Sequence, residues 1–117
     1  MAKLQTGTCH CGAIAFEVET GLEQVVECNC SHCSRKGYLL TFVPGDALRI
    51  TRGEGDLTTY TFNTHTIRHH FCPTCGCAPF GRGTAPTGQA TAAINVRCLE
   101  GVDPKELTVT QVDGRSF

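Results

Sequence analysis

Three short segments decide how this chain folds, and each is built on cysteine: Cys9-His10-Cys11-Gly12, Cys28-Asn29-Cys30-Ser31-His32-Cys33 and Cys72-Pro73-Thr74-Cys75-Gly76-Cys77. They hold eight of the nine cysteines, and Cys98 stands apart. A Cys-x-Cys pair on an extended segment directs both sulfurs to one face, and a Cys-x-x-Cys pair brings them together on a tight turn. Zinc takes four such ligands in a tetrahedron, with Zn–S distances of about 2.3 Å. The three segments therefore predict metal binding.

The glycines indicate which cysteines share a site. Cys11 and Cys75 are each followed directly by glycine. Glycine allows a tight turn behind the ligand, so that backbone N–H groups can point at the sulfurs. We therefore predict that Cys9, Cys11, Cys72 and Cys75 form a closed four-thiolate site with a structural role, which joins the start of the chain to its second half.

The middle segment lacks such a glycine and offers three thiolates, Cys28, Cys30 and Cys33. Three protein ligands with one open position are typical of catalytic zinc. A second structural site, completed by Cys77, Cys98 or a histidine, is the alternative. The histidines themselves are expected to serve ordinary hydrogen-bonding roles rather than to bind metal.

The rest of the composition explains why the chain needs such support. The chain has 117 residues, the size of one domain, and no tryptophan. Leu, Ile, Val and Phe account for 26 residues, only just above the level of roughly 20% below which chains are typically disordered. The formal net charge of −1 argues against a protein that binds nucleic acid through bulk positive charge.

The cysteines are expected to be reduced. Residues 1–7 contain no apolar stretch of signal-peptide length, and no segment reaches the ~20 apolar residues of a membrane helix. We therefore expect a cytoplasmic protein without membrane contact. The alternative is a secreted disulfide protein that has lost its signal peptide, in which nine cysteines would leave one thiol unpaired.

The pattern between the cysteine segments predicts a mainly β fold, with one domain over residues 1–117. Apolar residues alternate at Ile14, Phe16 and Val18. Short turns of helix are expected after Cys30 and at Asp103–Glu106, where Asp103 caps the turn. Gly53–Asp56 is predicted to be a hairpin turn, and Gly81–Gly88 a loop. The further strands are predicted at 38–43, 48–50, 57–62, 67–71, 92–97 and 107–112.

The order of these motifs resembles a known family. Cys-x-Cys-Gly (9–12), Cys-x-Cys-x-x-Cys (28–33) and Phe-Cys-x-x-Cys-Gly (71–76) are similar to the motifs of the glutathione-dependent formaldehyde-activating enzyme family, which includes centromere protein V. The resemblance implies a zinc-stapled β-tent of short antiparallel sheets with two zinc ions. It implies Cys9, Cys11, Cys72 and Cys75 as the structural site, and Cys28, Cys30 and Cys33 as the catalytic site. It also implies condensation of formaldehyde with glutathione to S-hydroxymethylglutathione.

Three hypotheses follow for the function. The first is a zinc-dependent carbon–sulfur lyase that adds glutathione or a similar small thiol to formaldehyde or another small aldehyde, with Arg35 and Lys36 holding the carboxylates of the thiol. It expects two zinc ions per chain, the second only partly occupied because thiolates oxidise readily. The second is a non-catalytic zinc-binding module for a macromolecular partner, which would use the Gly81–Gly88 loop or a sheet face. The third is a redox or metal sensor that uses Cys77 and Cys98.

Overall fold

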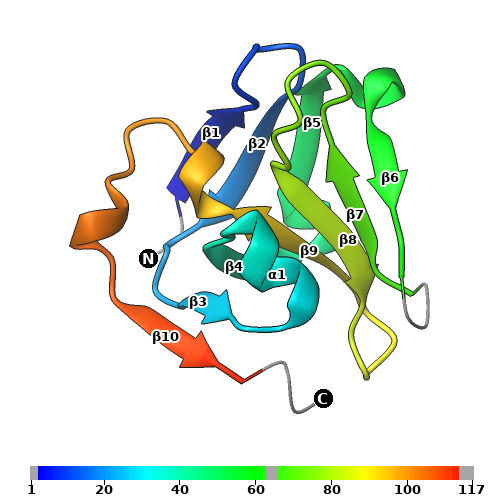
Figure 1. Cartoon of the computed structure of the whole chain (residues 1–117). Helices are drawn as coiled ribbons and strands as arrows, with labels where there is room; N and C mark the ends of the chain where they lie inside the picture. Colours follow the sequence, from blue (N-terminus) through cyan, green and yellow to red (C-terminus); the bar gives the residue numbers. More distant parts are fainter. Residues whose placement is uncertain (1–2, 63–65, 114–117) are drawn as a thin grey trace.

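The computed structural model describes residues 3–62 and 66–113, and two β-sheets dominate it (Figure 1). The smaller sheet has the strand order β1-β2-β5, and the larger has the order β10-β3-β4-β9-β8-β7-β6. Neighbouring strands are antiparallel except for β10 and β3, which are parallel. The bounds of the strands are β1 Lys3–Thr8, β2 Ala15–Thr20, β3 Val25–Cys28, β4 Leu40–Pro44, β5 Leu48–Arg52, β6 Thr58–Tyr60, β7 Arg68–Phe71, β8 Phe80–Thr84, β9 Ala90–Asn95 and β10 Val109–Val112.

Helical structure is confined to short segments. The helix α1 (Ser31–Lys36) follows Cys30 directly, as the sequence predicts. The 3₁₀ helices are η1 (Gly45–Ala47), η2 (Glu54–Asp56), η3 (Val96–Cys98) and η4 (Pro104–Glu106). Asp103 caps η4 by accepting a hydrogen bond from the Lys105 N–H, which confirms that prediction. Within the described residues, no helix is both long enough and apolar enough to cross a membrane.

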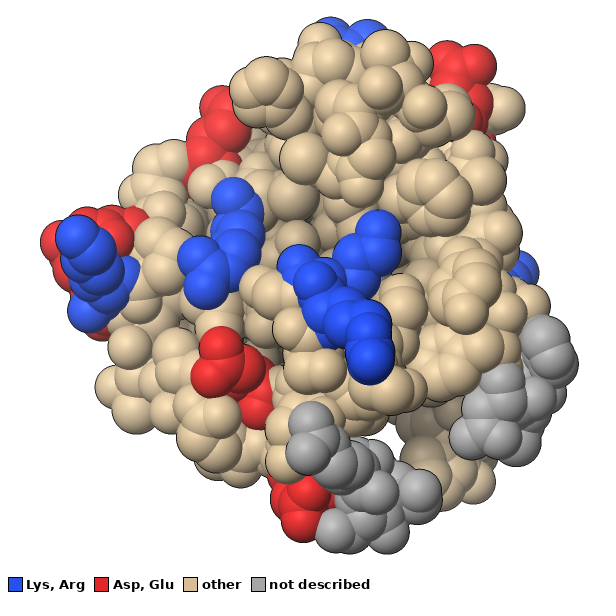
Figure 2. All heavy atoms as spheres, in the orientation of Figure 1, with Lys and Arg blue, Asp and Glu red and all other residues tan. Residues whose placement is uncertain are grey.

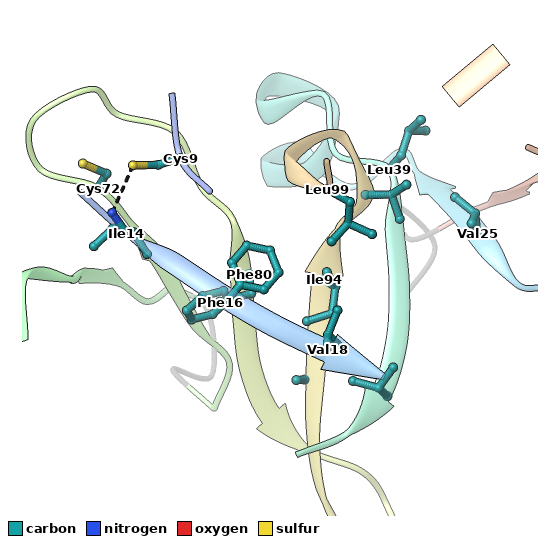
Figure 3. Close-up of a cluster of buried hydrophobic side chains, with 13 residues drawn as sticks. Cys9, Ile14, Phe16, Val18, Val25, Leu39, Cys72, Phe80, Ile94 and Leu99 are labelled. Carbon is teal, nitrogen blue, oxygen red and sulfur yellow. Dashed lines mark hydrogen bonds between the residues drawn. The ribbon is translucent and has the colours of Figure 1, made fainter. Parts of the chain in front are cut away.

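The core lies between the two sheets. Strand β2 contributes Phe16 and Val18, whose side chains are almost fully buried because the strand alternates apolar and polar residues. Phe16 meets Phe80 of β8 edge-on, with ring centroids 5.4 Å apart. Figure 3 shows β2 crossing the strands of the larger sheet, with these two rings in contact and Ile94 beside Val18. The two sheets therefore share one apolar layer, and Cys9 and Cys72 lie at its edge.

The mainly β fold is confirmed, and several of the local predictions need correction. Gly53–Asp56 is not a hairpin turn: it holds η2, and the strands on either side belong to different sheets, since β5 pairs with β2 and β6 pairs with β7. The predicted loop at Gly81–Gly88 is strand β8 as far as Thr84, and only Ala85–Gly88 form the turn. Strands β1 and β3 were not predicted. The parallel pairing of β10 with β3 departs from the antiparallel sheets that the resemblance implies.

The glycine at position 7 shows how tightly β1 packs. A Cβ atom at Gly7 would lie 2.5 Å from Phe16 Cζ and 2.7 Å from the carbonyl oxygen of Cys98. Backbone cannot give way as a flexible side chain can, so only glycine allows β1 to approach this closely. In contrast, a Cβ atom at Gly55 in η2 would meet no atom within 4 Å.

We expect Gly7→Ala to lower the free energy of unfolding by about 1–3 kcal/mol, as overpacking of a core does. Gly55→Ala serves as the matched control and is expected to leave stability unchanged or to raise it by up to about 1 kcal/mol, because alanine restricts the unfolded chain. Urea denaturation followed by circular dichroism measures both variants. Equal stabilities of the two variants would contradict the close packing of β1 against Phe16.

Candidate metal centres and ligand pocket

The first cysteine cluster joins two chain segments that are far apart in the sequence. Cys9 follows β1, and Cys72 follows β7. The Cys11 sulfur lies 3.7 Å from that of Cys9 and 3.6 Å from that of Cys72, and the four sulfurs of Cys9, Cys11, Cys72 and Cys75 all lie within 4.8 Å of one another. Two sulfurs bonded as a disulfide are only about 2.05 Å apart, whereas tetrahedral zinc with Zn–S bonds of about 2.3 Å requires about 3.8 Å. The spacing therefore fits a metal and not a disulfide.

The two glycines that follow Cys11 and Cys75 form the tight turns that the sequence predicts. Gly12 has φ +83° and Gly76 has φ +79°, both in the left-handed region. The turns bring N–H groups to the sulfurs: Ile14 donates to Cys9 Sγ at 3.3 Å, a contact drawn in Figure 3. Such hydrogen bonds stabilise thiolates, and they orient the sulfurs for a metal.

Hydrogen bonds and neighbouring thiols give the thiols of this cluster different acidities. Hydrogen bonds from the backbone of Cys77, and then of Cys11, lower the pKa of Cys75 to about 5. The backbone of Ala13 acts to lower the pKa of Cys11, but the Cys72 thiol, burial and the other neighbouring thiols raise it to about 11. Four sulfurs this close repel one another as anions, and a metal ion removes that repulsion.

The second cluster is built on the start of α1. Strand β3 ends at Cys28, and Cys30 is the N-cap of the helix, where its sulfur accepts a hydrogen bond from the Cys33 N–H at 3.3 Å. The Cys30 N–H in turn donates to Cys28 Sγ at 3.4 Å. The three sulfurs lie within 4.8 Å of one another, and no fourth ligand joins them among the described residues. A helix N-cap thus supplies the N–H groups that glycine turns supply in the first cluster.

The thiols of the second cluster differ in acidity. Burial acts to raise the pKa of Cys30, but the Cys33 N–H, the Cys33 thiol and the His32 N–H outweigh it and lower the pKa overall. Burial and the neighbouring thiols of Cys30 and Cys28 raise the pKa of Cys33. A hollow of about 250 Å³ lies beside this cluster and is bordered by Cys28, Cys33 and Tyr38.

Arg35 and Lys36 lie on the opposite side of α1 from these sulfurs. A helix has 3.6 residues per turn, so positions 30, 33, 34 and 37 share one side and positions 31, 32, 35 and 36 share the other. The second side borders a larger cavity, of about 580 Å³. We call this cavity the ring pocket, because six of its lining residues carry rings: His32, Tyr38, Tyr60, Phe62, His69 and Phe71. Tyr38 borders both the ring pocket and the hollow at the second cluster.

The rings of this pocket were not predicted as a site, although the sequence contains a signal for them. Tyr60 lies opposite His69 in the pairing of β6 with β7, and Phe71 is two residues beyond His69, so all three share one face of the sheet. His70 points the other way into the core, where its ring nitrogens bond to Thr59 Oγ1 at 3.0 Å and Arg82 Nε at 3.2 Å. Alternating rings on two neighbouring strands are the pattern that could have indicated the pocket.

Cys77 and Cys98 join neither cluster. Both border a separate hollow of about 350 Å³, together with Lys36 and Arg97. Burial, and then the neighbouring thiols of Cys77, Cys9 and Cys75, raise the pKa of Cys98 to about 12. Among the described residues, no histidine joins either group of close sulfurs, and the expectation that the histidines do not bind metal stays a prediction.

The fold and the two thiol clusters define a small β protein with two candidate metal centres. The family model for the glutathione-dependent formaldehyde-activating enzyme matches residues 4–111, and the chain belongs to this family. The fold is similar to the crystal structure of a Rhodobacter sphaeroides protein, with a TM-score of 0.78 and 38% sequence identity, over 90% of this chain and 99% of that chain. Both cysteine clusters could hold metal ions.

The predicted division into a structural and a catalytic site yields a prediction about stability. We expect Cys9→Ser and Cys75→Ser to unfold or aggregate the protein, because a structural zinc ion supplies folding free energy on the order of 10 kcal/mol. Cys28→Ser is expected to cost much less, since no distant strands are joined through it alone. Thermal unfolding followed by circular dichroism compares the three variants. Similar losses for all three would contradict the assignment of one structural and one catalytic cluster.

Proposed function

We propose that this protein is a zinc-dependent enzyme of the carbon–sulfur lyase type, which adds a small thiol such as glutathione to formaldehyde or another small aldehyde. The observation that carries the proposal is the second cluster, where three sulfurs converge beside a hollow and no fourth ligand joins them among the described residues. Three protein ligands with one open position are the arrangement of catalytic zinc. The description of the family supports the two substrates.

The proposal assigns one zinc ion to each cluster. Cys9, Cys11, Cys72 and Cys75 would hold the structural ion, and Cys28, Cys30 and Cys33 the catalytic one. When bound, zinc supplies positive charge that lowers the pKa of a nearby thiol and polarises a carbonyl oxygen. The catalytic ion is expected to be partly occupied in purified protein, because its thiolates oxidise more readily than those of a closed site.

The reaction needs neither an oxidant nor a reductant. The thiol sulfur forms a bond to the carbonyl carbon, the π electron pair of the C=O bond moves to oxygen, and the proton lost by the thiol ends on that oxygen. With formaldehyde and glutathione the product is S-hydroxymethylglutathione. We assign Tyr38 a supporting role, because it borders the hollow at the cluster and its hydroxyl can donate a hydrogen bond there. Burial and the nearby thiols, that of Cys33 first, raise its pKa to about 12.

Arg35 and Lys36 are proposed to hold the carboxylates of the thiol. Both lie across α1 from the sulfurs, so a thiol bound at the second cluster has to reach around the end of the helix. Lys36 is the better placed of the two, because it is the last residue of α1 and is followed directly by Gly37 and Tyr38, which border the hollow at the cluster. Lys and Arg attract carboxylates through charge, and Arg does so with two parallel hydrogen bonds.

We assign this activity to the cytoplasm. The nine cysteines are unpaired, and glutathione keeps thiols reduced in that compartment. The thiol substrate and the free ligand cysteines would then be available under the same conditions.

Zinc content and glutathione binding test the proposal together. We expect two zinc ions per chain by elemental analysis of freshly reduced protein, and heat of glutathione binding by calorimetry. Cys30→Ser should abolish that heat and lower the zinc content to one ion per chain. Serine is itself a good N-cap, so the variant removes a thiolate while it keeps the cap of α1.

Cys77→Ser is the matched control, because Cys77 is a cysteine outside both clusters. It should retain both zinc ions and the heat of glutathione binding. Absence of heat with glutathione, cysteine and coenzyme A at full zinc occupancy would refute the enzyme proposal.

A non-catalytic module is the second candidate, and one observation favours it. Phe42 and Ile67 are more than half exposed, and both border a hollow of about 240 Å³ beside Gly81 and Gly83. This hollow lies on a sheet face at the start of Gly81–Gly88, the segment that the sequence analysis proposed for binding a macromolecular partner. Zinc in both clusters without any binding of thiols would favour this candidate.

A further inference from the structure

We infer that the ring pocket binds a small, flat aromatic or heteroaromatic group that carries a carboxylate. The pocket is a binding site on the far side of α1 from the second cysteine cluster, and the inference does not depend on the proposed function. Its volume of about 580 Å³ falls within the roughly 300–1,000 Å³ of small-molecule sites. Formaldehyde would fill only a small part of it.

The arrangement of the rings determines the shape of the site. His32 stacks with Tyr60 at a centroid distance of 5.5 Å and an interplanar angle of 25°, and Phe62 stacks with His69 at 5.4 Å and 19°. Tyr60 and Phe62 are themselves stacked at 5.8 Å and 24°. The stack is not flat throughout, since His32 is tilted by 40° to Phe62 and by 48° to His69. Its open face is the Tyr60 ring, which remains 49% exposed. A planar ligand can add to such a stack with good contact, which a branched or puckered ligand cannot achieve.

His32 supplies an independent observation. Both of its ring nitrogens are buried, and neither has a hydrogen-bond partner among the described residues. A buried polar atom without a partner costs about 1–3 kcal/mol. Polar atoms of this kind, next to apolar rings in one cavity, are typical of a site that a ligand completes. Because both nitrogens are covered, a heteroaromatic ligand can place a donor or an acceptor against the imidazole only when a neighbouring ring turns aside.

The charged residues at the edge of the pocket indicate the charge of the ligand. Aromatic cages commonly bind cations, but here Lys36 Nζ already lies over the Phe71 ring at 5.2 Å from its centroid. Arg35 adds a second positive charge, and none of the described lining residues is acidic. Figure 2 shows Lys and Arg side chains gathered over α1. A cationic ligand would be repelled, whereas a carboxylate meets two cations.

Titration with benzoate tests the inference. The titration contains no thiol and no aldehyde, so a failure of benzoate to bind would leave the proposed function of the second cluster untouched. Nuclear magnetic resonance should report saturable shifts at the ring protons of His32 and His69. Cyclohexanecarboxylate has the same charge but is not flat, and toluene is flat but uncharged. Both should bind at least about threefold more weakly than benzoate, since stacking and charge each contribute.

The variants separate the pocket from the rest of the surface. We expect Tyr60→Ala to weaken benzoate binding about two- to twelvefold, as the loss of one ring contact of about 0.5–1.5 kcal/mol implies. Arg35→Gln should weaken benzoate binding more than Tyr60→Ala does, and it should leave the binding of toluene unchanged. Phe42→Ala is the matched control, because Phe42 is equally exposed on the sheet but borders a different hollow. It should leave benzoate binding unchanged.

The folded state of each variant is checked by its unfolding midpoint, which should stay near that of the parent because Tyr60 and Phe42 are half exposed. No saturable binding of benzoate, shifts confined to residues outside the ring pocket, or equal effects of Tyr60→Ala and Phe42→Ala would each overturn the inference. Tighter binding of cyclohexanecarboxylate than of benzoate would overturn it as well.

Discussion

The contact between the sulfurs of the first cluster is the interaction on which the rest of the structure depends. Cys11 and Cys72 are 61 residues apart in the sequence, and their sulfurs lie 3.6 Å from each other. The core immediately behind them is small, and Ile14 of that core donates its N–H to Cys9. The apolar layer between the two sheets is small, so the fold needs this link for its stability. Because sulfurs this close repel one another once ionised, the link is strong only with a cation among them.

The helix α1 separates two sites of different chemistry. A helix of six residues is not stable by itself, so its neighbours must hold it. Cys30 caps its start, and Gly37 ends it in the left-handed conformation with φ +73°. Tyr38 and Leu40 anchor the segment that follows in a small second core. The sulfurs face one side of this helix and the rings face the other, so one short element positions both a candidate metal site and an aromatic cavity.

The sequence predicted the clusters better than it predicted the sheets. The four-cysteine grouping followed from local chemistry, because a glycine behind a ligand has one clear physical use, and the structure brings those four sulfurs together. The ring pocket was missed because its members come from α1, β6, β7 and the segments that follow α1 and β6, and only the fold places them together. Arg35 and Lys36 were expected beside the open zinc site, where they would hold carboxylates, but the phase of the helix places them on the other side of α1 from the sulfurs. Their role in binding stays a prediction.

The strand errors have a common cause. Gly81 and Gly83 suggest a loop, yet a Cβ atom at Gly81 would lie 3.1 Å from the carbonyl oxygen of Arg68, so glycine there serves close packing of β8 against β7. Strand β3 has only four residues, too few to display a period. The turn at Gly53–Asp56 looks like a hairpin locally, and only the partners of β5 and β6 in different sheets reveal otherwise.

The parallel pairing of β10 with β3 bears on the order in which the molecule assembles during synthesis. Val112 lies opposite Cys28, and the Asn29 N–H donates to the Val112 carbonyl at 3.1 Å. The strand that carries the second cluster therefore lacks one neighbour until residue 112 has left the ribosome. Pairings between segments this far apart in a chain form slowly, so the four-cysteine cluster can come together before the edge of the strand that carries the three-cysteine cluster is paired.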